Sequence, residues 1–297
     1  MLIFACPGQG SQAKGFLTSW LEHLPTLEER LKQYSESCGR DLVELGTIAE
    51  EETIRDTANA QRLIVGASLA IYREAFANKK LDGVLGHSVG EIAAAAIAGV
   101  ISDQEALQLV GVRADAMAKA AALTPTSMAA VVGGEEQAVL AAIADCGLQP
   151  ANFNGAGQIV AAGGKDEISK LISAPPEKAR VIELKVAGAF HTSFMQSAVE
   201  SVAEFASGIS AQEPTCKLWS NSAGQLVTSG AEFLNLLVDQ IARPVRWDLC
   251  MASINHDGNT VAELPPAGAL SGLLKRGADK VHAIAIQEVQ DVEKVIQ

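Results

Sequence analysis

The segment Gly86–Gly90, Gly-His-Ser-Val-Gly, contains the serine whose neighbours best suit it to chemistry. The apolar run Leu81–Leu85 before it predicts a buried strand, and the alanine-rich run Glu91–Ala98 after it predicts a helix. A serine on a sharp strand-to-helix turn is typical of the nucleophile elbow of acyl-transferring enzymes. The flanking glycines remove Cβ atoms that would clash in the turn. We therefore expect the Ser88 hydroxyl to stand clear of the sheet as a nucleophile.

The backbone N–H of Val89 falls at the N-terminus of the predicted helix. There it can stabilise the oxyanion that forms when a serine attacks an acyl group. The five-residue pattern also occurs by chance, and a purely structural turn is the alternative interpretation. The strand before it and the helix after it favour the acyl-transfer serine.

A serine nucleophile needs a base, and five histidines are available. His87 adjoins Ser88, so its ring is expected to point elsewhere on a tight turn. His191 lies at a predicted strand-to-helix junction, Gly188–Thr192, and is the candidate base. A partly buried structural histidine is the alternative there. The remaining histidines lie in polar surroundings and are expected at the surface: His23, His256 and His282.

The elements around these residues alternate between strands and helices, which predicts a mainly parallel sheet covered on both faces. The first strand, Leu2–Ala5, ends in a glycine-rich loop, Pro7–Gln12. That loop is too short for a P-loop and lacks its lysine. Helical patterns are expected at Phe16–Trp20, Leu27–Cys38, Ala60–Ala75, Asp103–Ala122, Ser193–Ala206 and Ala231–Ile241, and further short strands at Leu218–Ser220 and Thr260–Leu264.

Residues 124–188 have a different pattern, strand-helix-strand-strand-helix-strand, which is that of a ferredoxin-like unit. We expect them to form an inserted small subdomain, and residues 1–123 and 189–297 to form the large catalytic α/β lobe. The four strands are expected at Met128–Val132, Gln149–Phe153, Gln158–Ala162 and Arg180–Val186, and the two helices at Glu135–Cys146 and Lys165–Ser173.

The charge, hydropathy and cysteine content of the chain exclude several classes of function. The formal net charge of -12 argues against a nucleic-acid-binding surface. The longest apolar run, Ile92–Ile101, is about half of a membrane span, and no signal peptide is visible. Five scattered cysteines without metal-ligand spacing fit reduced core residues. These features predict a cytoplasmic protein with no membrane or nucleic-acid partner and no metal, and a monomer is expected.

Six motifs occur in this order along the chain: Pro7–Gln12, Gly86–Glu91, Arg113, Asn152–Gln158, Gly188–Thr192 and Gln240–Trp247. Together and in this order they resemble the malonyl-CoA:acyl-carrier-protein transacylases, over nearly the whole chain and most closely the free-standing enzymes of actinobacterial type. Two features depart from the family pattern: Cys6 replaces a bulkier apolar residue, and Glu263–Gly268 replaces a loop richer in glycine.

The resemblance implies a fold and an activity. The fold is an α/β-hydrolase-like large lobe with a ferredoxin-like insert. The activity moves the malonyl group from malonyl-CoA, through a seryl ester, to the phosphopantetheine thiol of acyl carrier protein for fatty acid synthesis, with no cofactor. Ser88 is then the nucleophile, His191 its base, and the backbone carbonyl of Gln240 the group that holds the imidazole. The N–H groups of Gln9 and Val89 form the oxyanion hole.

The resemblance also implies that Arg113 holds the malonyl carboxylate. A guanidinium is a rigid two-pronged donor, so it both orients malonyl and rejects uncharged acyl groups. Taken alone, Arg113 is better interpreted as a solvated helix residue. The set of motifs reverses that interpretation.

Three other functions stay open on sequence. A serine hydrolase would pass the acyl group to water, but Arg113 and the lack of an obvious acidic triad member speak against it. A silent module could hold a carrier protein without chemistry, which intact Ser88 and His191 disfavour. The same chemistry could serve a polyketide or malonate decarboxylase pathway. Because carrier proteins are generally acidic, docking also needs a local basic patch, and the candidates are Arg243, Arg246, Lys275 and Arg276.

Overall fold

The computed structural model describes the backbone of residues 1–296 and the side chains of residues 1–295. Its main sheet has the order β10-β9-β1-β2-β7, and every neighbouring pair of strands is parallel. The expected parallel sheet is therefore confirmed. The five strands are β1 (Leu2–Cys6), β2 (Gly83–Gly86), β7 (Lys217–Leu218), β9 (Asn259–Glu263) and β10 (Val281–Ala285).

Alternate side chains of β1 enter two different cores, because successive residues of a strand point to opposite faces. Phe4 and Cys6 pack in the larger core, against the long helices. Ile3 and Ala5 pack in a second core with Trp247. The sheet is thus covered on both faces, as the near-continuous apolar strands predict.

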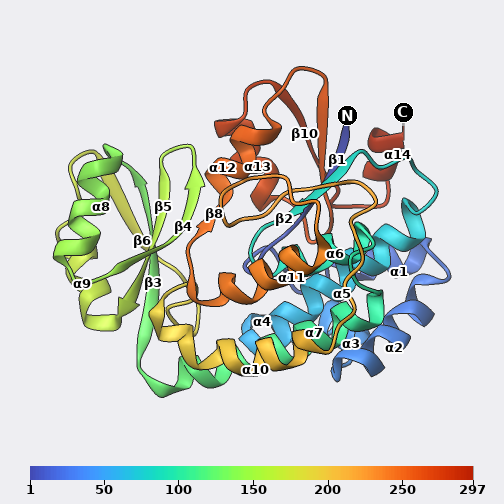
Figure 1. The fold of residues 1–297 in the computed structure, drawn as a ribbon, viewed down its shortest axis with the longest axis horizontal. Coiled ribbons are helices and arrows are strands. Elements are labelled where there is room, and N and C mark those ends of the chain that lie inside the picture. Colours follow the sequence, from blue (N-terminus) through green and yellow to red (C-terminus); the bar gives the residue numbers. More distant parts are fainter. Residues whose placement is uncertain (297) are drawn as a thin grey trace.

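Three helices position the elbow on the larger-core side of the sheet: α5 (Thr57–Ala75), α6 (Gly90–Ile97) and α7 (Asp103–Leu123). A capping box of Ser102 and Glu105 fixes the start of α7. Figure 1 shows these helices together below the sheet, with both chain termini at its far end. The other helices are α1 (Thr18–His23), α2 (Leu27–Cys38), α3 (Leu42–Thr47), α4 (Glu51–Arg55), α10 (Gln196–Ser207), α11 (Gly230–Asp239), α12 (Trp247–Ile254), α13 (Ala269–Gly277) and α14 (Asp291–Ile296).

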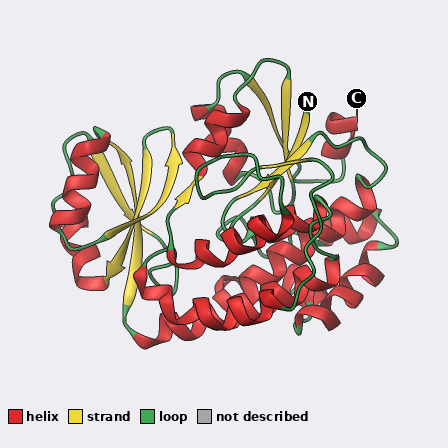
Figure 2. Ribbon diagram, viewed as in Figure 1, coloured by secondary structure: helices red, strands yellow, loops and turns green. Residues whose placement is uncertain are grey.

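A second, mostly antiparallel sheet has the order β6-β3-β5-β4-β8. Its first four strands and two helices follow the expected ferredoxin-like order, and Figure 2 shows this unit at the left, with its helices on the outer face. We propose that the insert spans residues 124–188. Its elements are β3 (Thr126–Gly133), α8 (Glu136–Asp145), β4 (Gln149–Gly155), β5 (Gln158–Gly164), α9 (Lys165–Ser173) and β6 (Ala179–Glu183).

The structure differs from the expected elements at the edges of the insert. The large lobe contributes a fifth strand, β8 (Val245–Arg246), which pairs parallel to β4. Strand β6 ends at Glu183, earlier than expected, so Leu184 and Val186 turn into the space between the lobes. None of the described helices is long and apolar enough to cross a membrane.

Candidate active site

The turn at Ser88 is as sharp as the sequence predicts. Ser88 adopts a left-handed backbone with φ 52°. A Cβ atom on Gly86 would overlap the backbone of Gly90, and one on Gly90 would overlap the carbonyl of Cys6. Only glycine fits at either position, so the two glycines let β2 pass directly into α6 and leave Ser88 at the apex.

Three residues from distant parts of the chain form a hydrogen-bonded line. Ser88 Oγ lies 2.7 Å from His191 Nε2, and His191 Nδ1 lies 2.7 Å from the backbone oxygen of Gln240. A carbonyl only accepts, so Nδ1 carries the ring hydrogen and donates it. Nε2 is then free to accept the proton of the Ser88 hydroxyl. The arrangement has the geometry of a nucleophile, its base and an orienting group.

The carbonyl of Gln240 is available because it follows the last residue of α11. The final carbonyls of a helix have no partner within it and carry a partial negative charge. The Arg243 N–H contacts this oxygen weakly, at 3.4 Å. A neutral carbonyl therefore stands where many serine enzymes use a carboxylate.

His191 is 4% exposed, and it too has a left-handed backbone, with φ 61°. Burial, with the positive charge of Arg113 as a second cause, lowers the pKa of His191 to about 3, although the bond to Gln240 opposes the shift. The imidazole is thus neutral at physiological pH and can accept a proton.

The low pKa of His191 gives a testable pH dependence. The rate of inactivation by a neutral serine-directed sulfonyl fluoride should stay constant as the pH falls from neutral to about pH 5. With a base of ordinary histidine pKa, that rate would fall to half near pH 6.5. Arg113→Met removes a charge that disfavours imidazolium, so the pKa of His191 should rise and the loss of rate should move to higher pH. Half-maximal rates near pH 6.5 for both proteins would contradict this electrostatic account.

Arg113 reaches the nucleophile from α7 and is 2% exposed. Its Nη2 lies 3.5 Å from Ser88 Oγ and 3.2 Å from Gln240 Oε1, and its Nη1 donates to Gln61 Oε1 at 2.6 Å. Burial lowers its pKa to about 10, so it stays charged at neutral pH. All three of these acceptors are uncharged, and the guanidinium is therefore suited to receive an anion from the cleft.

The cleft that holds these groups lies between the two lobes. Gln9 and Val89 both line it beside Ser88, and among the described residues neither backbone N–H donates a hydrogen bond. Two such donors beside a nucleophile can bind an oxyanion. The apolar residues that line the cleft are Met117, Met128, Val160, Leu184, Val186 and Phe190.

The remaining histidines behave as expected. His87 turns away from the nucleophile: its Nε2 lies 2.9 Å from Asn154 Oδ1, and its ring packs edge-on against Trp247. Since Asn154 is on β4, this contact ties the elbow to the insert. His23, His256 and His282 are exposed.

Three buried polar residues of the site were not predicted from sequence: Gln61, Glu91 and Asn221. Glu91 accepts from the Asn221 N–H at 2.6 Å and from Gln240 Nε2. Burial raises the pKa of Glu91 to about 8, against the bond from Asn221 and the charge of Arg113. Glu91 is the last residue of the elbow motif, so the sequence carries a signal that could have pointed to it. Gln61 and Asn221 belong to no motif, so the sequence carries no such signal for them.

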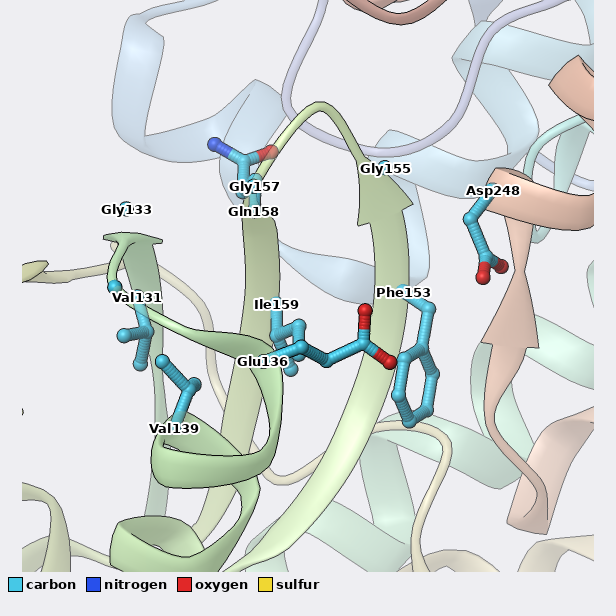
Figure 3. A pocket seen from close by; sticks show the side chains of 11 residues that line it. Val131, Gly133, Glu136, Val139, Phe153, Gly155, Gly157, Gln158, Ile159 and Asp248 are labelled. Carbon is cyan, nitrogen blue, oxygen red and sulfur yellow. The ribbon is translucent and has the colours of Figure 1, made fainter.

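A separate pocket lies within the insert, and Figure 3 shows Glu136 and Phe153 beside it. It is lined by residues of β3, α8, β4 and β5 and by Asp248 of α12, and it shares no lining residue with the cleft at Ser88. Among residues 1–295 no group of three or more histidine, cysteine, aspartate or glutamate side chains is placed to hold a metal ion.

Comparison with known proteins identifies the family. The sequence model of the acyl transferase domain family matches residues 3–295 of this chain. The chain is 47% identical to the malonyl CoA-acyl carrier protein transacylase of Mycobacterium bovis, covering 99% of both chains. With that of Escherichia coli K12 it shares 30% identity over 96% of this chain and 95% of the relative.

Solved structures agree with this match. The crystal structure of the Mycobacterium tuberculosis enzyme superposes with a TM-score of 0.95 at 46% identity, covering all of both chains. A malonyl-transacylase solved in complex with a type II polyketide acyl-carrier protein gives a TM-score of 0.91 at 28% identity, covering 99% of this chain and 98% of that one. This protein therefore belongs to the acyl transferase domain family and, within it, to the malonyl CoA-acyl carrier protein transacylases.

Proposed function

We propose that this protein transfers the malonyl group of malonyl-CoA to the phosphopantetheine thiol of an acyl carrier protein, and so supplies fatty acid synthesis. One observation carries the proposal. A buried, charged Arg113 lies 3.5 Å from Ser88 Oγ, which itself lies 2.7 Å from the base His191. A nucleophile beside a buried cation whose hydrogen-bond partners are all uncharged suits an acyl group that ends in a carboxylate.

In the first half-reaction Ser88 Oγ attacks the thioester carbonyl while His191 Nε2 takes its proton. The N–H groups of Gln9 and Val89 hold the oxyanion. The intermediate then collapses, the carbon–sulfur bond breaks, and the imidazolium returns the proton to the departing CoA sulfur. The products are CoA and a malonyl ester on Ser88.

The second half-reaction runs the same steps in reverse with a new thiol. His191 takes the proton of the phosphopantetheine thiol, and the sulfur attacks the ester carbonyl. Collapse releases Ser88 Oγ, which regains its proton from the imidazolium. Because the same base serves both steps, His191 must be neutral whenever a thiol or hydroxyl attacks, and its low pKa keeps it so.

The mass of the intact protein tests this function. Mixing with malonyl-CoA should add the mass of one malonyl group, which persists until holo acyl carrier protein is added and then disappears. Loss of the ester to water without carrier protein would indicate a serine hydrolase, and no ester at all would indicate a silent binding module. Fatty-acid and polyketide carrier proteins should be compared as acceptors.

The cleft mouth suggests where the carrier protein docks. Arg276 on α13 lines the mouth together with Gln9 and Asn154, and the neighbouring Lys275 is exposed. The other two candidates are engaged locally. Arg246 binds Asp248 and stacks on Phe153, and Arg243 lies 3.7 Å from Asp239.

We therefore expect Lys275→Glu with Arg276→Glu to raise the KM for carrier protein and to leave malonylation by malonyl-CoA nearly unchanged. The reason is that an acidic partner meets a reversed local charge, which outweighs the screened overall charge. Steady-state kinetics and single-turnover acylation separate the two effects. Lys170→Glu on α9, 67% exposed, is the matched control. If both half-reactions fall together, the pair serves CoA binding or folding.

We also propose that the reaction is cytoplasmic and needs no cofactor beyond its substrates. All five cysteines are free thiols, which suits a reducing compartment. The mechanism above uses only side chains and backbone groups of this chain, with the phosphopantetheine brought by the carrier protein.

A further inference from the structure

A fully buried asparagine, Asn221, lies directly beneath the nucleophile elbow. It follows β7 at the start of a tight turn, and no step of the acyl transfer uses it. Its side-chain amide nevertheless contacts both halves of the catalytic line. Asn221 therefore requires an explanation other than packing.

The first set of contacts holds the elbow. Asn221 Oδ1 accepts from the Ser88 N–H at 2.8 Å, and Nδ2 donates to the Gly86 carbonyl at 2.8 Å. The left-handed backbone of Ser88 takes its N–H out of the sheet and helix patterns. A buried N–H without a partner is costly, so the amide of Asn221 stabilises the strained turn.

The second set of contacts holds the anchor of the imidazole. Asn221 Oδ1 also lies 3.3 Å from Gln240 Nε2. Arg113 can only donate, so Gln240 must turn its oxygen toward Arg113 and its NH₂ toward Asn221 and Glu91. The side chain of Gln240 is thereby fixed, and with it the backbone carbonyl that holds His191.

Glu91 hydrogen-bonds to both Asn221 and Gln240. One of its carboxyl oxygens accepts from the Asn221 backbone N–H at 2.6 Å, and the other accepts from Gln240. The N–H donors of Asn221 and Gln240 in this buried group therefore meet acceptors, as a network needs in order to specify one geometry. Among the described residues, Asn221 is the only one whose side chain hydrogen-bonds to both the Ser88 backbone and Gln240.

We propose that Asn221 is a positioning residue for acyl transfer, whose amide fixes the nucleophile and the anchor of its base in one geometry. The proposal rests on the proposed function, because malonylation of Ser88 is the readout. Without the amide, the Ser88 N–H and the Gly86 carbonyl lose their partners and the Ser88 Oγ to His191 Nε2 contact loosens. A misplacement of about 1 Å can cost on the order of 10²-fold in rate.

Asn221→Ala should therefore lower the kcat of malonylation on the order of 10²-fold, with little change in the KM for malonyl-CoA. The KM should hold because Arg113 keeps its bond to Gln61. Inactivation by a serine-directed sulfonyl fluoride should slow in the same proportion, since it depends on Ser88 and His191 but not on malonyl binding. Asn221→Ser, whose shorter side chain cannot reach both elbow groups, should behave alike if the alanine variant does not fold.

Asn259→Ala is the matched control. Asn259 is 4% exposed and begins β9, at the end of the parallel strands opposite the elbow, and its amide donates to the Ile254 carbonyl at 2.8 Å. Both substitutions should lower the melting temperature, but only Asn221→Ala should lower kcat. Wild-type kcat in a folded Asn221 variant would overturn the proposal. A wild-type protein that forms no malonyl ester would instead refute the proposed function.

Discussion

Ser88→Ala should form no malonyl ester, and His191→Ala should acylate more slowly by a factor on the order of 10² to 10⁴. The alanine at position 88 removes the attacking oxygen. The alanine at position 191 leaves Ser88 Oγ without the acceptor that lies 2.7 Å away. The mass of the intact protein after a short incubation with malonyl-CoA measures both effects.

His282→Ala is the control for the histidine, since that side chain is exposed. It should acylate at the wild-type rate. If Ser88→Ala acquires a malonyl group on another residue, Ser88 is not the nucleophile. If His191→Ala acylates as fast as the wild type, the base is a different group.

Arg113→Ala should lose malonyl transfer and shift the preference toward acetyl. In the proposed mechanism the buried guanidinium of the wild type receives the malonyl carboxylate. The variant would bury that carboxylate without a partner, whereas an acetyl group needs none. Arg113→Lys should also be poor, because an ammonium does not offer two parallel donors. The ratio of kcat/KM for malonyl-CoA and acetyl-CoA measures the change.

The proposed role of Arg113 implies a second source of selectivity, which acts through His191. The charge of Arg113 is one cause of the low pKa of His191. A bound malonyl carboxylate would offset that charge and so make His191 a stronger base when the correct acyl group is present. An unchanged malonyl-to-acetyl ratio in Arg113→Ala would exclude both roles.

Local patterns were enough to predict the elbow, four strands of the parallel sheet (β1, β2, β7 and β9) and the four strands of the insert, but neither β10 nor β8. Strand, glycine-flanked serine and helix are contiguous, so the turn at Ser88 could be predicted from one short segment. The ferredoxin-like unit follows from the order of its periodic segments. The pairing of Ser88 with His191 and Arg113 depended instead on resemblance, because residues far apart in sequence carry no local mark of their proximity.

Residues whose role is set by tertiary contacts could not be predicted. Asn221 stands in a short polar turn that resembles any surface loop, yet it is fully buried. Gln61 lies on an apolar helix with no motif, and only its bond to Arg113 shows its part in the site. Strand β8 has two residues, too few for a periodic signal, and forms only because β4 offers a free edge.

Ser88 and His191 both have left-handed backbones. At these two positions the residue that serves activity best is therefore not the residue that stabilises the fold best. This conformation costs an ordinary residue roughly 1–2 kcal/mol and costs glycine almost nothing. Selection for thermal endurance alone would therefore favour glycine at Ser88, and the resulting protein would be inert. Hosts that grow at high temperature must strengthen such an enzyme elsewhere, in loops, caps and surface ion pairs, because the apex of the elbow is not open to improvement.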